Sequence, residues 1–315
     1  MESTKEKHII SYDCGYAIRA IAMLMIIFVH SINEYECYSS NISHLLLIPM
    51  FGILGCCLFF FMSGYGMVNS LYKNRPTAKY LITHIKKIII PVIVVYIINS
   101  ILLPHTMAYN NIEIDHYNIF TLSLPEGTDI WFIKIILFDY ITTFLLFKLI
   151  AETKKRFIYL AIVQTALVAT LFLCKAGGYW YISNLCFVLG AIHTTYPVFK
   201  KKHIAMSITL FAIYYLCIIN GIVSAPIQIV GGLAFCVIAL CALEKTTYRP
   251  QWLLYIGKNS LLYYLLSIPA MWLIPSNIMH FTLYFAANII ATTIFVFAYK
   301  GIAKLLTEKI HPTNE

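Results

Sequence analysis

The stretch that decides the fold is RAIAMLMIIFVH, residues 19–30, in which an arginine and a histidine flank ten apolar residues. It lies in an apolar run over about 16–34, which is long enough for one α-helix to cross a membrane. Eleven steps of about 100° make three turns and about 20°, so Arg19 and His30 lie on one helix face, about 16 Å apart along the axis. We therefore expect a transmembrane helix with a charged group near one end and a titratable group deeper along the same face.

Nine further apolar runs follow this one. They lie at about 45–70, 81–103, 130–150, 157–174, 179–198, 203–221, 225–243, 252–274 and 280–299. Hydrophobic residues make up 60% of the 315 and charged residues 12%, whereas a soluble protein carries about 25% charged residues. This composition excludes a soluble domain, a disordered chain, a coiled coil, a disulfide scaffold and a nucleic-acid binder. We expect an all-α integral membrane protein with about ten transmembrane helices. It should form a single domain over 1–315, with its core at about 12–305 and no separate soluble domain.

The basic residues behind the net charge of +9 fall almost entirely on one side of the predicted membrane. When Lys and Arg are grouped by alternate connections and adjacent helix ends, 21 of the 23 fall on one side of the membrane, and only Lys134 and Lys175 fall toward the other. Basic residues collect in cytoplasmic loops. We therefore expect both termini in the cytoplasm, an even number of crossings and a multi-pass protein of the inner (cytoplasmic) membrane of the cell.

Ionisable residues inside a membrane helix are functional candidates, because each costs a few kcal/mol unless it is paired or faces water. A histidine side chain ordinarily titrates near neutral pH, which makes His30 a candidate. Glu34 lies one helical turn further on the same face, where its carboxylate would hold one tautomer of the imidazole. The structural alternative is that Arg19 extends to the lipid headgroups and His30 bonds a neighbouring helix.

The second and third apolar runs each have a distinctive polar end. The second ends in LFFFMSGYGM, residues 58–67, whose serine and glycines let another backbone come close. The third begins HIKKIIIP, residues 84–91. Lysines that extend to the headgroups would explain this start, and so would a phosphate-bearing ligand that enters from the cytoplasm. The basic residues available to such a ligand are Arg19, Arg75, His84, Lys86 and Lys87.

The order of these motifs resembles the acyltransferase 3 family of membrane acyltransferases. An arginine, ten residues and a histidine in the first helix are followed by FFxxSGY in the second and by a basic start with a proline in the third. Three later stretches are similar to the family's WF segment, its short FxxG segment and its late stretch with glycine, serine and YL. They are DIWFI at 129–133, FVLG at 187–190 and YIGKNSLLYYLL at 255–266. The resemblance spans Arg19 to about Ala270.

The resemblance implies an enzyme that moves an acyl group, commonly acetyl, from acyl-CoA to a hydroxyl of an extracytoplasmic sugar, polysaccharide or glycolipid. In the family the first-helix histidine is taken as catalytic, which corresponds to His30, with Arg19 as its companion. Ser63 and Gly64 match the motif that lines the same cavity. The chain departs from the family at Ser267, where a histidine usually follows YL, and at Lys86 and Lys87, where arginines are more common.

The chemistry of acyl transfer fits these residues. A base must take the hydroxyl proton, and a histidine that titrates near neutral pH can return it to the leaving thiolate. We expect His30, Arg19 and Glu34 to be the catalytic residues. Donors to the tetrahedral oxyanion are needed as well, and the expected substrate-binding residues are Ser63, Gly64, Tyr65 and Trp131. The phosphates of acetyl-CoA require cations, and the expected ones are Arg19, His84, Lys86 and Lys87.

The partners expected are a surface polysaccharide or glycolipid acceptor and the lipid bilayer, with no nucleic acid and no metal, since the nine cysteines are scattered without a CxxC pair. An alternative function is a transporter or exporter of polysaccharide or lipid-linked sugar, which would carry an internal repeat with broken helices. A polysaccharide polymerase is a third possibility. The sequence leaves open the acceptor, the oligomeric state, and whether the acyl group rests on His30 before transfer.

Overall fold

The computed structural model describes residues 10–36, 48–110, 131–197, 201–275 and 280–310, and within them the chain is all helical. The eleven α-helices and one 3₁₀ turn are α1 (Tyr12–Glu36), α2 (Ile48–Lys73), α3 (Ala78–Asn110), α4 (Trp131–Leu149), α5 (Thr153–Leu173), η1 (Gly178–Trp180), α6 (Asn184–His193), α7 (Lys201–Ile219), α8 (Ala225–Lys245), α9 (Gln251–Lys258), α10 (Ser260–Trp272) and α11 (Phe281–Ile310). The expected all-α membrane fold is confirmed, and every predicted apolar run contains a helix.

Seven of the described helices, α1, α2, α3, α5, α7, α8 and α11, are long and apolar enough to cross a membrane. Three of the predicted runs differ from this pattern. The run at 130–150 forms α4, which carries Lys134, Asp139 and Lys148. The run at 179–198 forms η1 and the ten-residue α6.

The third difference is a break in the run at 252–274, which divides into α9 and α10 at Asn259. The Asn259 side-chain amide donates to the carbonyl oxygen of Tyr255 at 2.8 Å. A short polar side chain that bonds the local backbone competes with helix hydrogen bonding. α10 is thereby left with 13 residues.

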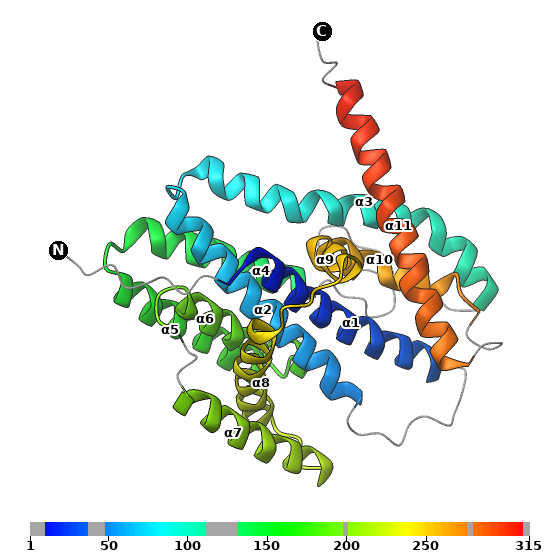
Figure 1. The fold of residues 1–315 in the computed structure, drawn as a ribbon. Helices are drawn as coiled ribbons and strands as arrows, with labels where there is room; N and C mark the ends of the chain where they lie inside the picture. The colour runs from blue at the N-terminus through cyan, green and yellow to red at the C-terminus, as the bar shows by residue number, and fades with distance from the viewer. Residues whose placement is uncertain (1–9, 37–47, 111–130, 198–200, 276–279, 311–315) are drawn as a thin grey trace.

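The helices α1 and α2 lie at the centre of the bundle (Figure 1). More than half of the spanning segment is buried in each of them, and less than a quarter in α3, α5, α7 and α11. α2 packs against α1 and α6, α7 packs against α8, and α9 and α10 pack against α1. The two helices with the most distinctive motifs are therefore the most buried of the seven long helices.

Glycines allow the central helices to come into backbone contact. A Cβ on Gly64 of α2 would collide with the carbonyl oxygen of Phe187 in α6, and a Cβ on Gly190 of α6 would collide with that of Phe61 in α2. Gly257 of α9 meets the carbonyl oxygen of Tyr16 in the same way. The prediction that the small residues of the second run admit another backbone is confirmed for Gly64.

Candidate functional site

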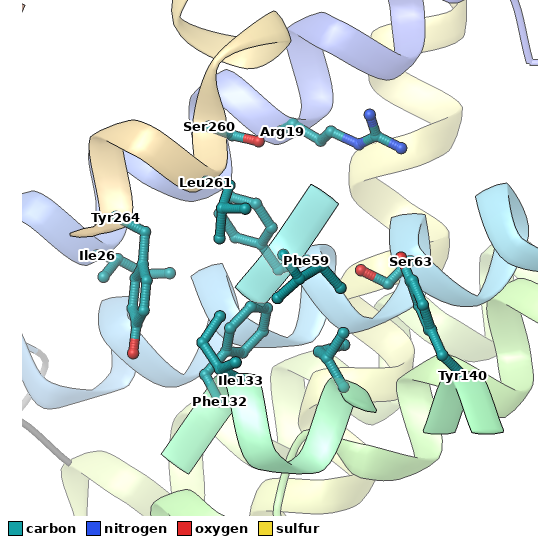
Figure 2. A pocket seen from close by; sticks show the side chains of 12 residues that line it. Arg19, Ile26, Phe59, Ser63, Phe132, Ile133, Tyr140, Ser260, Leu261 and Tyr264 are labelled. Atoms are coloured by element: carbon teal, nitrogen blue, oxygen red, sulfur yellow. The ribbon is translucent and has the colours of Figure 1, made fainter. Parts of the chain in front are cut away.

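A cavity of about 180 Å³ lies between α1, α2, α3, α4 and α10 (Figure 2). We call it the inner cavity. Its walls are mostly apolar, with one charged residue and four hydroxyl groups. The lining residues are Arg19, Ile26, Phe59, Ser63, Ile88, Phe132, Ile133, Ile136, Tyr140, Ser260, Leu261 and Tyr264. The cavity therefore joins the first-helix motif, the second-helix motif, the fourth helix and the late stretch of the sequence.

A second cavity of about 310 Å³ lies where α2 ends and α1 begins, and we call it the vestibule. It has a lysine, an arginine, three tyrosines and three small polar side chains. Its lining residues are Ile10, Ser11, Tyr12, Gly15, Tyr16, Arg19, Met62, Tyr65, Gly66, Asn69, Ser70 and Lys73. Arg19 lines both cavities, so one side chain is common to the two walls.

The position of Arg19 depends on a glycine of α2. A Cβ on Gly66 would lie 3.3 Å from the Arg19 guanidinium, so a larger residue would crowd the arginine. Figure 2 shows the Arg19 side chain extended toward the same region as Ser63 and Tyr140. Because a guanidinium keeps its charge and donates several hydrogen bonds, it can hold an anionic or carbonyl group in the cavities that it lines.

Ser63 and Tyr140 form the polar part of the inner cavity below Arg19. Their hydroxyl groups lie beside each other in Figure 2. Ser63 was predicted from the sequence, but Tyr140 was not. A tyrosine inside an apolar run follows Asp139 there, and that polar pair was the signal available.

His30 lies on the same face of α1 as the cavity residues, but it lines neither cavity. Ile26 lines the inner cavity, and His30 is four residues, or about 6 Å, further along the same helix face. The side chain of His30 is half-buried, as is that of Glu34 one turn beyond. Arg19 therefore lines the inner cavity, and His30 lies on the same helix face about one turn beyond Ile26, outside the cavity wall.

The other predicted substrate-binding residues lie outside the wall of the inner cavity. Gly64 is buried at the contact between α2 and α6. Tyr65 lines the vestibule, and its hydroxyl accepts a hydrogen bond from the backbone N–H of Ile10 at 2.8 Å. Trp131 stacks on Phe60 with ring centroids 6.3 Å apart, behind the cavity residue Phe132 rather than in the wall. Of this set only Ser63 lines the inner cavity.

The predicted cations of α3 are not gathered at either cavity. His84 has its Nδ1 3.0 Å from the carbonyl oxygen of Tyr80, and its ring packs on the Tyr80 ring at 4.1 Å. Lys86 and Lys87 are exposed, while the next residue, Ile88, lines the inner cavity. One and two helix steps turn the lysines by about 100° and 200° from Ile88. The cation that does line the vestibule beside Arg19 is Lys73, whose Nζ lies 5.8 Å from the centre of the Tyr12 ring.

The late stretch contributes residues that the sequence analysis did not select. Ser260, Leu261 and Tyr264 line the inner cavity. Ser267, which occupies the place of the family's late histidine, is buried, and its hydroxyl donates to the carbonyl oxygen of Tyr264 at 3.3 Å. The buried hydroxyl is therefore satisfied within α10 itself.

Comparison with known proteins gives one match. A protein-family model described as an acyltransferase domain matches residues 16–300 of the chain. No curated protein and no solved structure matches it. The matched region runs from α1 into α11 and contains every residue that lines the inner cavity.

Proposed function

The chain belongs to the acyltransferase 3 family, the membrane acyltransferases, and we propose that it moves an acyl group, commonly acetyl, from cytoplasmic acyl-CoA to a hydroxyl of an extracytoplasmic sugar, polysaccharide or glycolipid. The observation that supports this most is that Arg19 lines both the vestibule and the inner cavity. The vestibule accepts the donor from one side of the arginine, and the inner cavity leads from its other side toward His30.

The proposal requires a defined topology. In addition to the seven long helices, three further crossings are formed by α4, by η1 with α6, and by α9 with α10. This makes about ten crossings in all. The end of the bundle where α2 finishes at Lys73 is cytoplasmic, since basic residues collect on that side, and both termini lie there. The acceptor hydroxyl then approaches His30 from the opposite side of the inner membrane.

The vestibule fits the head of acyl-CoA. Lys73 and Arg19 supply positive charge for the phosphates, and Asn69 and Ser70 supply hydrogen-bonding groups. Lys86 and Lys87 contribute charge at the rim of the same end of the bundle, and His84 adds a polar group there. The thioester arm passes Arg19 and enters the inner cavity, whose largely apolar walls exclude water from the thioester.

His30 acts as the general base in this mechanism. It takes the proton of the acceptor hydroxyl as the new C–O bond forms, and the same proton passes to the thiolate as the C–S bond breaks, so that the products are the ester and free CoA. Glu34 holds the imidazole in the tautomer that the reaction needs. Arg19 and His30 are about 16 Å apart along α1, so Ser63 and Tyr140, which lie near Arg19, offer their hydroxyl groups to the thioester arm of the donor rather than to the oxyanion at His30.

Acetyl-CoA turnover tests the proposed function directly. Protein purified in detergent should release CoA from labelled acetyl-CoA, and cells that lack the gene should lose acetyl groups from a surface glycan while the glycan itself is still made. An exporter gives a different result, because the glycan would then disappear from the surface. Absence of CoA release together with an unchanged acetyl content would contradict the proposal.

Replacing Lys73 with alanine should weaken donor binding. One charge-assisted contact to a phosphate is lost, so we expect the KM for acetyl-CoA to rise roughly 10-fold with kcat unchanged. The matched control is Lys79→Ala, because Lys79 is exposed at the same end of the bundle and lines neither cavity. Equal KM values for both variants would place the donor outside the vestibule.

Replacing Tyr140 with phenylalanine should weaken binding of the donor's thioester arm in the inner cavity. The hydroxyl beside Ser63 is lost, and we expect the KM for acetyl-CoA to rise about 3-fold, with Ser63→Ala raising it about 10-fold. Thr143→Val is the control, since Thr143 is buried one turn along α4 and lines neither cavity. A wild-type KM in both Tyr140→Phe and Ser63→Ala would remove this pair from the donor site.

A further inference from the structure

The outer half of α1 packs against the first turns of α11 through matching stripes of side chains. On α1 the stripe is Phe28, Ser31 and Tyr35, and on α11 it is Phe281, Tyr284, Phe285 and Asn288. Phe28 contacts Phe285 with ring centroids 5.4 Å apart, and Tyr35 contacts Phe281 at 5.6 Å. Ser31 and Asn288 are the polar pair within this aromatic contact.

The polar pair is part of a buried chain of hydrogen bonds. The Asn288 Nδ2 donates to the Ser31 Oγ at 3.0 Å, and the Asn288 Oδ1 accepts from the Thr292 hydroxyl at 3.1 Å. The Ser31 hydroxyl donates in turn to the sulfur of Met271 in α10 at 3.7 Å. Ser31, Asn288 and Thr292 are fully buried. The chain therefore ties α1 to both α10 and α11 at one level.

The hydrogen bond between Asn288 and Ser31 differs from the neighbouring aromatic contacts because it is directional. Ring contacts tolerate small rotations and sliding, whereas a hydrogen bond weakens steeply when its angle changes. A single buried asparagine is known to select one register between apolar helices at little or no gain in stability. The contact between Ser31 and Asn288 is of the same kind, because one hydroxyl meets one amide within an otherwise apolar helix–helix contact.

Ser31 directly follows His30, which links this seam to the reaction. One helix step turns the side chain by about 100°, so holding Ser31 against α11 points His30 along the separate face that Ile26 shares with the inner cavity. A rotation of α1 that released Ser31 would move His30 by the same angle.

We propose that Asn288 is a positioning residue, which through Ser31 fixes the rotation of α1 so that His30 continues the face of the inner cavity. The effect of Asn288 on turnover rests on the proposed function. The rotation itself is a property of the helix packing and is measurable without acyl transfer.

Asn288→Leu and Ser31→Ala test the proposal by kinetics. Each should lower kcat for acetyl-CoA turnover by about 10-fold to 100-fold, because a small displacement of a catalytic group costs this much. The double variant should lose no more than either single one. The KM for acetyl-CoA should stay unchanged, because Arg19 at the vestibule is about 18 Å from Ser31 along the helix axis.

Thr293→Val is the matched control. Thr293 lies on α11 and shares a hydrogen bond of 2.8 Å with Tyr263 of α10, a pair that joins the same two helices without α1. It should keep wild-type kcat, and Asn288→Leu should lower the Tm by no more than this control does. Wild-type kcat in Asn288→Leu, or a rise in KM equal to the loss of kcat, would overturn the positioning role.

A nitroxide attached to His30→Cys gives a readout that does not depend on activity. After subtraction of the signal from the native cysteines, the spectrum should show one component with Asn288 present, a second component with Asn288→Leu, and one component with Thr293→Val. One component in all three would overturn the proposal. If the wild-type protein released no CoA from acetyl-CoA, the proposed function would fail, and these spectra alone would decide the role of Asn288.

Discussion

His30→Ala should abolish acyl transfer from acetyl-CoA while leaving the protein folded. Removal of a general base costs about 10²-fold to 10⁴-fold in rate, and alanine also removes the group that would return the proton to the thiolate. The half-buried His30 lies one turn past Ile26 on the cavity face of α1. The measurement is CoA release and acyl transfer by protein purified in detergent, with Tm and elution volume compared to wild type.

Two variants separate this effect from a general loss of structure. His30→Gln keeps a planar hydrogen-bonding side chain but cannot exchange a proton near neutral pH, so it should be nearly as inactive as His30→Ala. His280→Ala should keep wild-type turnover, because His280 is exposed at the start of α11. Normal transfer by His30→Ala would exclude His30 as the base, and the family membership would still stand.

Gly64→Val should prevent the central helices from packing. The Cβ alone would collide with the carbonyl oxygen of Phe187, and this backbone atom cannot move aside as a flexible side chain would. We expect a loss of roughly 3 kcal/mol or more in stability, since overpacking a well-packed core costs 1–3 kcal/mol even where side chains can adjust. The yield of monodisperse protein and its Tm in detergent are the measurements.

Gly190→Val should have the same effect, because the Cβ there would meet the carbonyl oxygen of Phe61 on the opposite helix. The control is Gly301→Val in α11, where a Cβ meets no atom within 4 Å. A surface substitution of this kind stays within about 0.5 kcal/mol. If Gly64→Val had wild-type yield and Tm, α2 and α6 would not cross at these glycines.

Much of the candidate site follows from local sequence patterns. Arg19 and His30 share a face of α1 because the helix repeat alone determines their angle, and Ile26 of the same face lines the inner cavity. Ser63 lines the inner cavity, and its role in binding substrate stays a prediction. Tyr140 and Lys73 could not be selected in the same way, because their roles depend on neighbours that lie far away in the chain.

The residues at the start of α3 show why local sequence patterns do not identify every cavity residue. Lys86, Lys87 and Ile88 are consecutive, and a basic cluster near a membrane boundary fits a phosphate ligand equally well whichever way it faces. The packing of α3 against α4 and α10 turns Ile88 inward and leaves the two lysines exposed. Gly64 is a similar case, since its place in the motif does not tell whether the space beside it holds a substrate or another helix.

Sequence patterns alone indicate a helical membrane acyltransferase with Arg19 and His30 on one helix face, because hydropathy, helix repeat and motif order are properties of short stretches of chain. The folded arrangement is needed to see that Arg19 lines two cavities, that Tyr140 lies beside Ser63, and that Asn288 meets Ser31. In a bilayer, lipid is as apolar as the helix surfaces, so close packing and a few directional polar contacts select which faces meet. Those contacts join residues more than 250 positions apart in the case of Ser31 and Asn288, and no local pattern encodes them.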